Sequence, residues 1–207
     1  MIYTSRMYPE VLTPSQFQLL SLIRNLSQEF GLVGGTAIAL QIGHRESIDF
    51  DLFKKGRLDI LKIRKAVTSS FPITSVKVEN PDEYTLIANN VQLTFFNFPF
   101  EIKFDVIFEG ISMPSLLTLA SMKAFALGKR AKWKDYIDLY FILKEYRLKE
   151  VVSKAEVIFK GEFSEKLFRE QLSFHEDIDY TEKISFKPGF EVEDSEVKRN
   201  LQEISLV

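Results

Sequence analysis

The chain has 207 residues, of which 45% are hydrophobic and 19 are Phe, and its formal net charge is −2. This composition supports a packed core and excludes global disorder; with no Cys in the chain, disulfide scaffolds, thiol nucleophiles and cysteine metal sites are excluded as well. Neither a secretory signal nor a run of about 20 apolar residues is evident, so we expect a cytoplasmic protein without a membrane span.

The first part of the chain alternates helix and strand patterns. The triplet Thr13-Pro14-Ser15 is typical of a helix start, and apolar residues at helical spacing follow it. A buried-strand pattern at 30–33 ends in Gly34-Gly35. The short helix expected over 36–41 stops at Gly43, a helix C-terminal glycine. The glycine pair therefore directly precedes a helix.

A strand is predicted over 47–53 because polar and apolar residues alternate there. Side chains two apart on a strand share a face, so Asp49 and Asp51 project to the same side. The apolar residues between and beside them share the opposite face: Ile48, Phe50 and Leu52. The pattern predicts a half-buried strand that presents two carboxylates.

The rest of the chain divides into a β-rich and a helical part. A helix is expected over 58–71, and β patterns follow it at 73–79, 84–88, 91–96 and 101–108. After Met113-Pro114 the apolar spacing is helical, and the charged C-terminal segment is expected to hold only short helices. This order predicts an α+β fold, with a mixed-sheet domain over 1–112 and a helical C-terminal lobe over 113–207.

The glycine pair and the two carboxylates indicate phosphate and metal chemistry. A helix N-terminus offers backbone N–H groups and a positive dipole end, and glycines let a triphosphate approach the backbone closely. Asp49 and Asp51 have the spacing for two oxygen ligands of one Mg²⁺. Gly-Gly is usually just a turn and Asp-x-Asp more often a solvated face, but their order and tight spacing favour a functional site.

Two segments resemble motifs of a known family. The segment VGGTAIALQIGHRESIDFDLF at 33–53 resembles the first motif of the nucleotidyltransferase superfamily. The fold of that superfamily is like the DNA polymerase beta palm. More narrowly, this segment resembles the AbiEii/AbiGii toxins of bacterial toxin–antitoxin and phage-defence systems. The segment LASMKAFALGKRAKWKDYIDLYFIL at 119–143 is similar to a second pattern of that family. The pattern has a Lys on a helix, a following Arg and an Asp-x-x-Asp pair. The resemblance extends over nearly the whole chain.

The resemblance implies a role for each matching residue of the first motif. It implies that the phosphates of an NTP are cradled at Gly34, Gly35 and Thr36. It also implies that Asp49 and Asp51 are ligands of Mg²⁺ (or Mn²⁺). The two sets together imply a catalytic site that binds an NTP through a metal ion.

The superfamily usually adds a third metal carboxylate from a neighbouring strand, and here two readings stay open. Asp105, in the pattern at 101–108, is one candidate ligand. The strand at 91–96 is the other possible neighbour, and it offers only Gln92 and Thr94. In that case the site has two acidic ligands.

In the C-terminal lobe, the resemblance implies that Lys123 contacts the triphosphate. It implies that Asp135 orients Lys123 or assists proton transfer. Asp138 is the second acid of the pair, and a structural or capping carboxylate is the alternative reading of it. Lys123 and Asp135 are therefore further candidate catalytic residues.

Basic residues near the two motifs are candidates for phosphate contacts. Arg45 follows the helix-ending glycine and either reaches a phosphate or pairs with Glu46. A basic cluster in the second motif is either a solvated helix end or the place of an RNA backbone. It consists of Lys129, Arg130, Lys132 and Lys134.

The resemblance implies a Mg²⁺-dependent nucleotidyltransferase that moves NMP from an NTP to an acceptor hydroxyl and releases pyrophosphate. It further implies a toxin that acts on RNA, for instance a tRNA acceptor end, and a separately encoded antitoxin as its partner. Three alternatives stay open: an NTP-binding regulatory module without catalysis, an enzyme of this fold acting on a protein or small molecule, and a structural protein.

Overall fold

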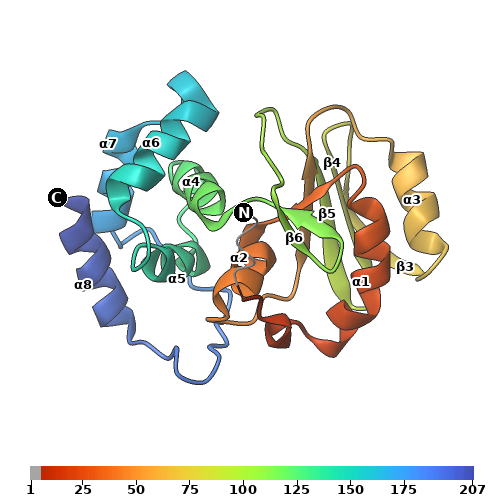
Figure 1. The fold of residues 1–207 in the computed structure, drawn as a ribbon, viewed down its shortest axis with the longest axis horizontal. Helices are drawn as coiled ribbons and strands as arrows, with labels where there is room; N and C mark the ends of the chain where they lie inside the picture. Colours follow the sequence, from red (N-terminus) through yellow and green to blue (C-terminus); the bar gives the residue numbers. More distant parts are fainter. Residues whose placement is uncertain (1–5) are drawn as a thin grey trace. The chain divides into compact units, whose positions relative to one another are not determined.

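The computed structural model describes residues 6–207, and the chain divides into two compact units between Ser115 and Leu116. The sequence pattern placed this division at 112/113. The first unit contains every strand among the described residues, and the second contains only helices and their connections (Figure 1). Each unit is described by itself below.

A five-stranded mixed sheet forms the centre of the first unit. Its strands lie in the order β1 (Gly31–Val33), β2 (Phe50–Lys54), β5 (Val91–Asn97), β4 (Glu83–Ala88) and β3 (Ile73–Glu79). The β2–β5 pair is parallel, and the other pairs are antiparallel. The turn between β4 and β5 is made by Asn89 and Asn90, both at positive φ, which confirms the tight turn that this dipeptide favours.

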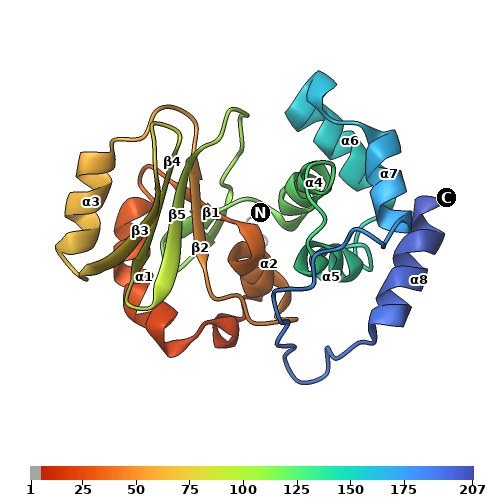
Figure 2. The ribbon, with the colours of Figure 1, turned by 180° about the vertical axis from the view of Figure 1, so that it is seen from behind.

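Three helices and a hairpin complete this unit. Helices α1 (Pro14–Leu26) and α3 (Ile60–Thr68) cover one face of the sheet, and α2 (Gly34–Ile42) lies on the other side, as Figure 2 shows from behind. A short 3₁₀ helix (Pro9–Val11) precedes α1, whose start is fixed by a capping box between Thr13 and Gln16. The hairpin consists of β6 (Val106–Phe108) and β7 (Ile111–Met113).

The face of the sheet beneath α1 and α3 carries the core of this unit. Strand register places Leu52, Phe95 and Tyr84 in one row across β2, β5 and β4. All three are completely buried. Because neighbouring residues of a strand point to opposite faces, Asp51 and its register partner Thr94 lie on the opposite face.

Edge strand β3 is exposed on both faces. Five of its seven residues are exposed, and its pairing with β4 is interrupted by two register shifts. Lys77 reaches over β4 and donates a hydrogen bond to Gln92 of β5 at 2.6 Å.

Two details of the predicted strands are wrong. The pattern at 101–108 forms a strand only at Val106–Phe108, which pairs with β7 and not with β2 or β5. Residues 101–105 join no strand; instead, Phe104 packs its ring against Gly31 of β1, where a Cβ atom would overlap it. Ile48 is 61% exposed because β2 starts only at Phe50.

The second unit is a group of helices with its own core. Its helices are α4 (Leu116–Leu127), α5 (Trp133–Ile142), α6 (Leu148–Phe159), α7 (Glu165–Ser173) and α8 (Asp194–Ser205), with a 3₁₀ turn at Lys160–Glu162. The rings of Phe125 on α4 and Phe159 on α6 stack with centroids 4.1 Å apart. Nowhere in residues 6–207 is there a helix with the length and apolar character needed to cross a membrane.

Candidate functional site

The turn between β1 and α2 brings a carboxylate to a helix N-terminus. Gly34, the first residue of α2, has a φ of +71°, a conformation that residues with a Cβ rarely adopt. A Cβ atom at Gly34 would overlap Oδ2 of Asp51, so this carboxylate lies directly against the glycine backbone. Val33, the N-cap residue, provides no side-chain cap to the first turn of α2, which leaves this helix end suited to an anionic ligand.

Replacing Gly34 by Ala is expected to impair function more than folding. The left-handed backbone costs an alanine about 1–2 kcal/mol, and the methyl group also displaces the Asp51 carboxylate. We expect nucleotide binding, measured by calorimetry with Mg²⁺ and an NTP, to weaken at least about tenfold. The matched control is Gly189→Ala, which has a φ of +88° but open space around it; it should lose similar stability in urea and keep nucleotide binding. Equal binding by both variants would contradict the role of Gly34.

Asp49 lies immediately before β2, and its backbone is anchored by two helices. The Thr36 hydroxyl of α2 donates a hydrogen bond to the Asp49 carbonyl and another, at 3.3 Å, to the Ser47 carbonyl. The Gln16 side-chain amide of α1 donates to the same Ser47 carbonyl at 2.8 Å. Thr36 and Gln16 are buried. The Thr36 side chain therefore positions the segment that carries Asp49, and the Thr36 backbone N–H lies in the first turn of α2.

The positively charged side chain of Arg45 lies beside the glycine pair. Arg45 is only 4% exposed, and its Nη1 donates to the carbonyl of Glu46 at 2.9 Å. A Cβ atom at Gly35 would lie 2.6 Å from Arg45 Nη2 and 2.9 Å from Ser47 Oγ. The guanidinium and a hydroxyl thus lie over the start of α2, where the charge of the guanidinium adds to the positive end of the helix dipole. Sequence reasoning did not single out Ser47, and its only signal was its position two residues before Asp49.

The structure places Asp105 away from the strand pair that carries Asp51. Asp51 is in register with Thr94 on β5, which corresponds to the alternative with Gln92 and Thr94 as neighbours. Asp105 is exposed and precedes β6, outside the five-stranded sheet. Within residues 6–207 no three His, Cys, Asp or Glu residues are grouped so that they could hold a metal ion. Two carboxylates nevertheless fit Mg²⁺, which is commonly held by one or two carboxylates together with substrate phosphates.

The candidate residues of the second motif form a buried ionic cluster in the second unit. Lys123 of α4 is 6% exposed and pairs with Asp135 and Asp138 of α5, which are both fully buried. The distance from Lys123 Nζ to Asp138 Oδ2 is 2.9 Å. Arg130 approaches the other oxygen of Asp135 at 3.5 Å. The Lys123 ammonium therefore balances two buried carboxylates, a requirement that helical spacing alone did not disclose.

The basic cluster of the second motif is partly neutralised by neighbouring groups. Lys132 and Lys134 both pair with Glu182. Partial burial opposes ionisation of this carboxyl, but the hydrogen bonds from the two lysines outweigh it and lower the pKa of Glu182 to about 2. Lys129 lies over the ring of Phe125, at 4.1 Å from its centroid.

Solved structures with this fold include nucleotidyltransferases. A putative nucleotidyltransferase from H. pylori matches with a TM-score of 0.57 at 15% identity, covering 93% of this chain and 92% of that one. JHP933 from Helicobacter pylori matches at 0.58 and 15%, covering 97% and 92%. The nucleotidyltransferase toxin MenT4 from Mycobacterium tuberculosis H37Rv matches at 0.57 and 13%, covering 92% and 82%. At these identities the likeness shows the fold, and the predicted nucleotidyltransferase fold with its mixed sheet and flanking helices is confirmed.

Sequence comparison agrees with the fold. The uncharacterized protein aq_aa25 of Aquifex aeolicus (strain VF5) is 26% identical over an alignment of 129 residues, which covers 58% of this chain and 61% of that relative. The chain thus matches less than two thirds of that relative's length. The family model for the nucleotidyl transferase AbiEii toxin of type IV toxin–antitoxin systems matches residues 19–196. Since that match includes the glycine turn, Asp49, Asp51 and the ionic cluster, the chain belongs to the AbiEii nucleotidyl transferase toxin family.

Proposed function

We propose that this protein transfers a nucleoside monophosphate from an NTP to an acceptor hydroxyl in an Mg²⁺- or Mn²⁺-dependent reaction. The observation that carries the proposal is the contact of the Asp51 carboxylate with Gly34 at the start of α2. In this contact a carboxylate, the kind of ligand that Mg²⁺ prefers, lies next to a helix end suited to phosphate. The acceptor is RNA, with a tRNA end as one example, and the biological setting is a toxin with a separately encoded antitoxin.

In the proposed function, different groups of the first unit bind the metal ion and the phosphates. Asp49 and Asp51 would hold the metal ion, and the first backbone N–H groups of α2, at Gly34 and Gly35, would hold the outer phosphates. Arg45, fixed over Gly35, adds positive charge to the side on which pyrophosphate departs. A divalent metal at this place neutralises charge on the phosphates as they react.

The transfer itself is a displacement at the α-phosphorus. A bond forms between the acceptor oxygen and the α-phosphorus, and the bond from the α-phosphorus to the oxygen that bridges to the β-phosphate breaks. Pyrophosphate leaves, and the proton of the hydroxyl passes to solvent. The attacking and leaving oxygens lie roughly in line in such reactions, so the acceptor arrives opposite the pyrophosphate.

The ionic cluster of Lys123, Asp135 and Asp138 suggests what the second unit contributes. Lys123 is bound between Asp135 and Asp138, so we propose that the three side chains first fix α4 against α5. In the second role that the resemblance implies, Lys123 contacts the triphosphate directly and Asp135 orients it. This role requires that one N–H of the Lys123 ammonium group donates to a phosphate oxygen and not to a carboxylate. Asp105 is proposed as a third metal ligand only if residues 101–105 move to the sheet.

The experiment that tests the proposed function uses Mg²⁺, each α-labelled NTP in turn and total bacterial RNA, followed by a denaturing gel. Label in a discrete RNA band identifies both the nucleotide and the acceptor. Label in protein or in a small molecule, with none in RNA, supports transfer to a different acceptor. A protein that neither binds NTP nor transfers label under any of these conditions contradicts the proposed function.

A second candidate is NTP binding without catalysis, and one observation favours it. Thr94 is the register partner of Asp51 on β5, and Asp105 lies outside the sheet. The strand next to β2 therefore supplies no third carboxylate opposite Asp51, and the superfamily's catalytic sites usually have one. NTP binding at micromolar affinity without pyrophosphate release, across RNA, protein and small-molecule acceptors, would support this candidate. Pyrophosphate release that depends on an acceptor excludes it.

A further inference from the structure

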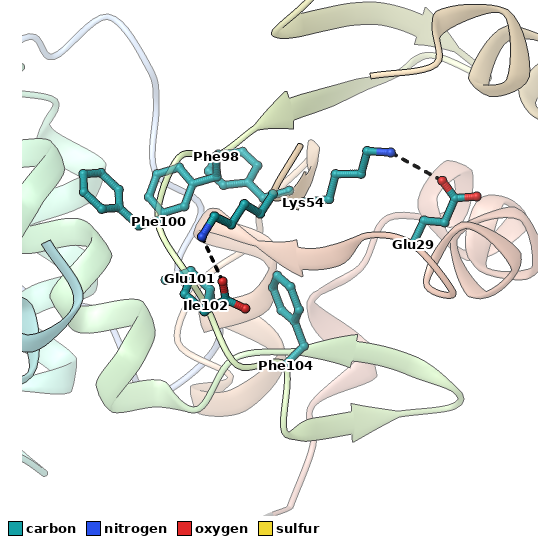
Figure 3. Close-up of a pocket in the computed structure, with 9 residues that line it drawn as sticks. Glu29, Lys54, Phe98, Phe100, Glu101, Ile102 and Phe104 are labelled. Carbon is teal, nitrogen blue, oxygen red and sulfur yellow. Dashed lines mark hydrogen bonds and ion pairs between the residues drawn. The ribbon is translucent and has the colours of Figure 1, made fainter. Parts of the chain in front are cut away.

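A pocket of about 430 Å³ lies in the first unit at the end of β2 that follows the carboxylates. It combines aromatic rings with lysine side chains, and Figure 3 shows Phe98 and Phe100 on one side of Glu101 and Phe104 on the other. Its aromatic and basic lining residues are Phe53, Lys54, Lys55, Phe98, Phe100 and Phe104. None of these residues belongs to the proposed metal and phosphate site.

The rings form a connected series on the carboxylate side of the sheet. Phe53 follows Asp51 by two residues on β2, so both side chains point to the same face. The Phe53 ring lies 5.3 Å from that of Phe98, and Phe98 lies 5.4 Å from Phe100, measured between ring centroids. All three residues are only partly buried. Partly exposed rings of this kind stack with nucleobases of any sequence.

Of the two lysines that line the pocket, Lys55 is held in a contact that a phosphate group can replace. Lys55 pairs with Glu101 at 3.1 Å, and their side chains are 58% and 80% exposed. An ion pair this exposed is weak and is screened by salt. Lys54 lies 3.5 Å from Glu29 and 5.1 Å from the centroid of the Phe30 ring. The pocket thus combines the exposed Lys55 ammonium group with aromatic rings, and basic groups together with aromatic rings bind single-stranded nucleic acid.

The strand register places this pocket opposite the phosphate-binding turn. Val33 is paired with Asp51, and Gly31 with Phe53. Gly34 therefore lies toward the Asp49 end of β2, and Phe53 lies toward the other end, with Asp51 between them. The in-line geometry of the proposed reaction places the acceptor opposite the leaving pyrophosphate. This step rests on the proposed function, in which pyrophosphate leaves on the side of Gly34. The acceptor then approaches from the side of Phe53, where the pocket lies.

We propose that this pocket binds the end of a single-stranded acceptor RNA. Terminal bases stack on Phe98 and Phe100, and a backbone phosphate takes the place of Glu101 on Lys55. The terminal hydroxyl then lies near the metal held by Asp51. Because stacking tolerates every base, the pocket selects an unpaired RNA end and not a particular sequence.

Binding of a 5′-fluorescein-labelled RNA octamer, measured by anisotropy without NTP, tests the proposal. Phe100→Ala is expected to raise the Kd at least about fivefold, since one base–aromatic stack accounts for a loss of that size. Lys55→Glu, at an exposed position that does not affect folding, should raise the Kd and make it less sensitive to salt. The matched controls are Phe17→Ala on α1, at 46% exposure, and Lys65→Glu on α3, which is exposed; both should bind RNA as the unaltered protein does.

A crosslinking measurement locates the bound end. An octamer with 5-iodouridine at its 3′ terminus, irradiated in complex with the protein, should attach to the peptide containing Phe98 and Phe100. Attachment elsewhere, or RNA affinities of Phe100→Ala and Lys55→Glu that equal those of the controls, overturns the proposal.

Nucleotide binding separates this proposal from the proposed function. Phe100→Ala and Lys55→Glu should keep the Kd for Mg²⁺–NTP, and in the labelling reaction they should raise the KM for RNA but not for NTP. If the Kd for NTP rises as much as that for RNA, the pocket holds the base of the NTP and the RNA proposal is wrong. If transfer to RNA persists with an unchanged KM, the pocket proposal fails and the proposed function stands. Failure of the unaltered protein to bind NTP contradicts the proposed function, while the octamer still tests the pocket.

Discussion

Replacing Asp51 by Asn is expected to reduce nucleotidyl transfer by about 10³-fold, because charge stabilisation by a bound metal ion is worth several kcal/mol in the transition state. The amide has nearly the shape of the carboxylate and fits the same place against Gly34. It carries no charge for Mg²⁺. The initial rate of label transfer from an α-labelled NTP, at saturating acceptor, measures the effect.

The control for Asp51→Asn is a second Asp→Asn change in the same unit. Asp59 caps α3 by accepting a hydrogen bond from the Lys62 N–H, and Asn caps helices about as well as Asp. Asp59→Asn should therefore keep both activity and stability. Transfer by Asp51→Asn within about tenfold of the unaltered rate would show that Asp51 does not hold the metal.

Replacing Lys123 by Met is expected to lower the free energy of unfolding by about 3–5 kcal/mol, the usual cost of leaving a buried charge without its partner. Met retains the length of the side chain and removes the ammonium group. Asp135 and Asp138 are fully buried, and both lose the ammonium group with which they pair. Urea denaturation followed by circular dichroism measures the change.

A double variant shows whether charge or shape is responsible. Lys123→Met combined with Asp138→Asn removes one of the two buried negative charges together with the ammonium. The pair should therefore be less destabilised than the sum of the single changes, and the difference is the coupling energy. Lys149→Met, at an exposed position on α6, serves as the control and should be close to neutral. A Lys123→Met protein with full stability but no transfer would instead support direct contact of Lys123 with the triphosphate.

Much of the fold could be predicted because its signals are local. The helix start at Thr13, the tight turn at Asn89-Asn90 and the glycine turn before α2 each depend on a few adjacent residues. The alternation around Asp51 likewise predicted which side of β2 is buried, since Phe50 and Leu52 are fully buried. These features require no knowledge of distant contacts.

The failures concern features that depend on distant partners. Residues 101–105 alternate as a strand does, but a strand forms only when a neighbour pairs with it, and β5 already occupies the edge of β2. Phe104 instead finds its contact at Gly31, more than seventy positions earlier in the chain. The second motif was identified from its resemblance to the family, whereas the balance of Lys123 between two buried carboxylates appears only when α4 packs on α5.

The open edge at β3 has a consequence for how the protein behaves at high concentration. A long, flat strand with unpaired backbone groups would recruit the same strand of another molecule and start a growing aggregate. The two register shifts between β3 and β4 bend this edge, and Lys77 and Glu79 place charges along it. These features disfavour edge-to-edge stacking, and they make β3 the first strand to leave unchanged when the surface is engineered for solubility or crystallisation.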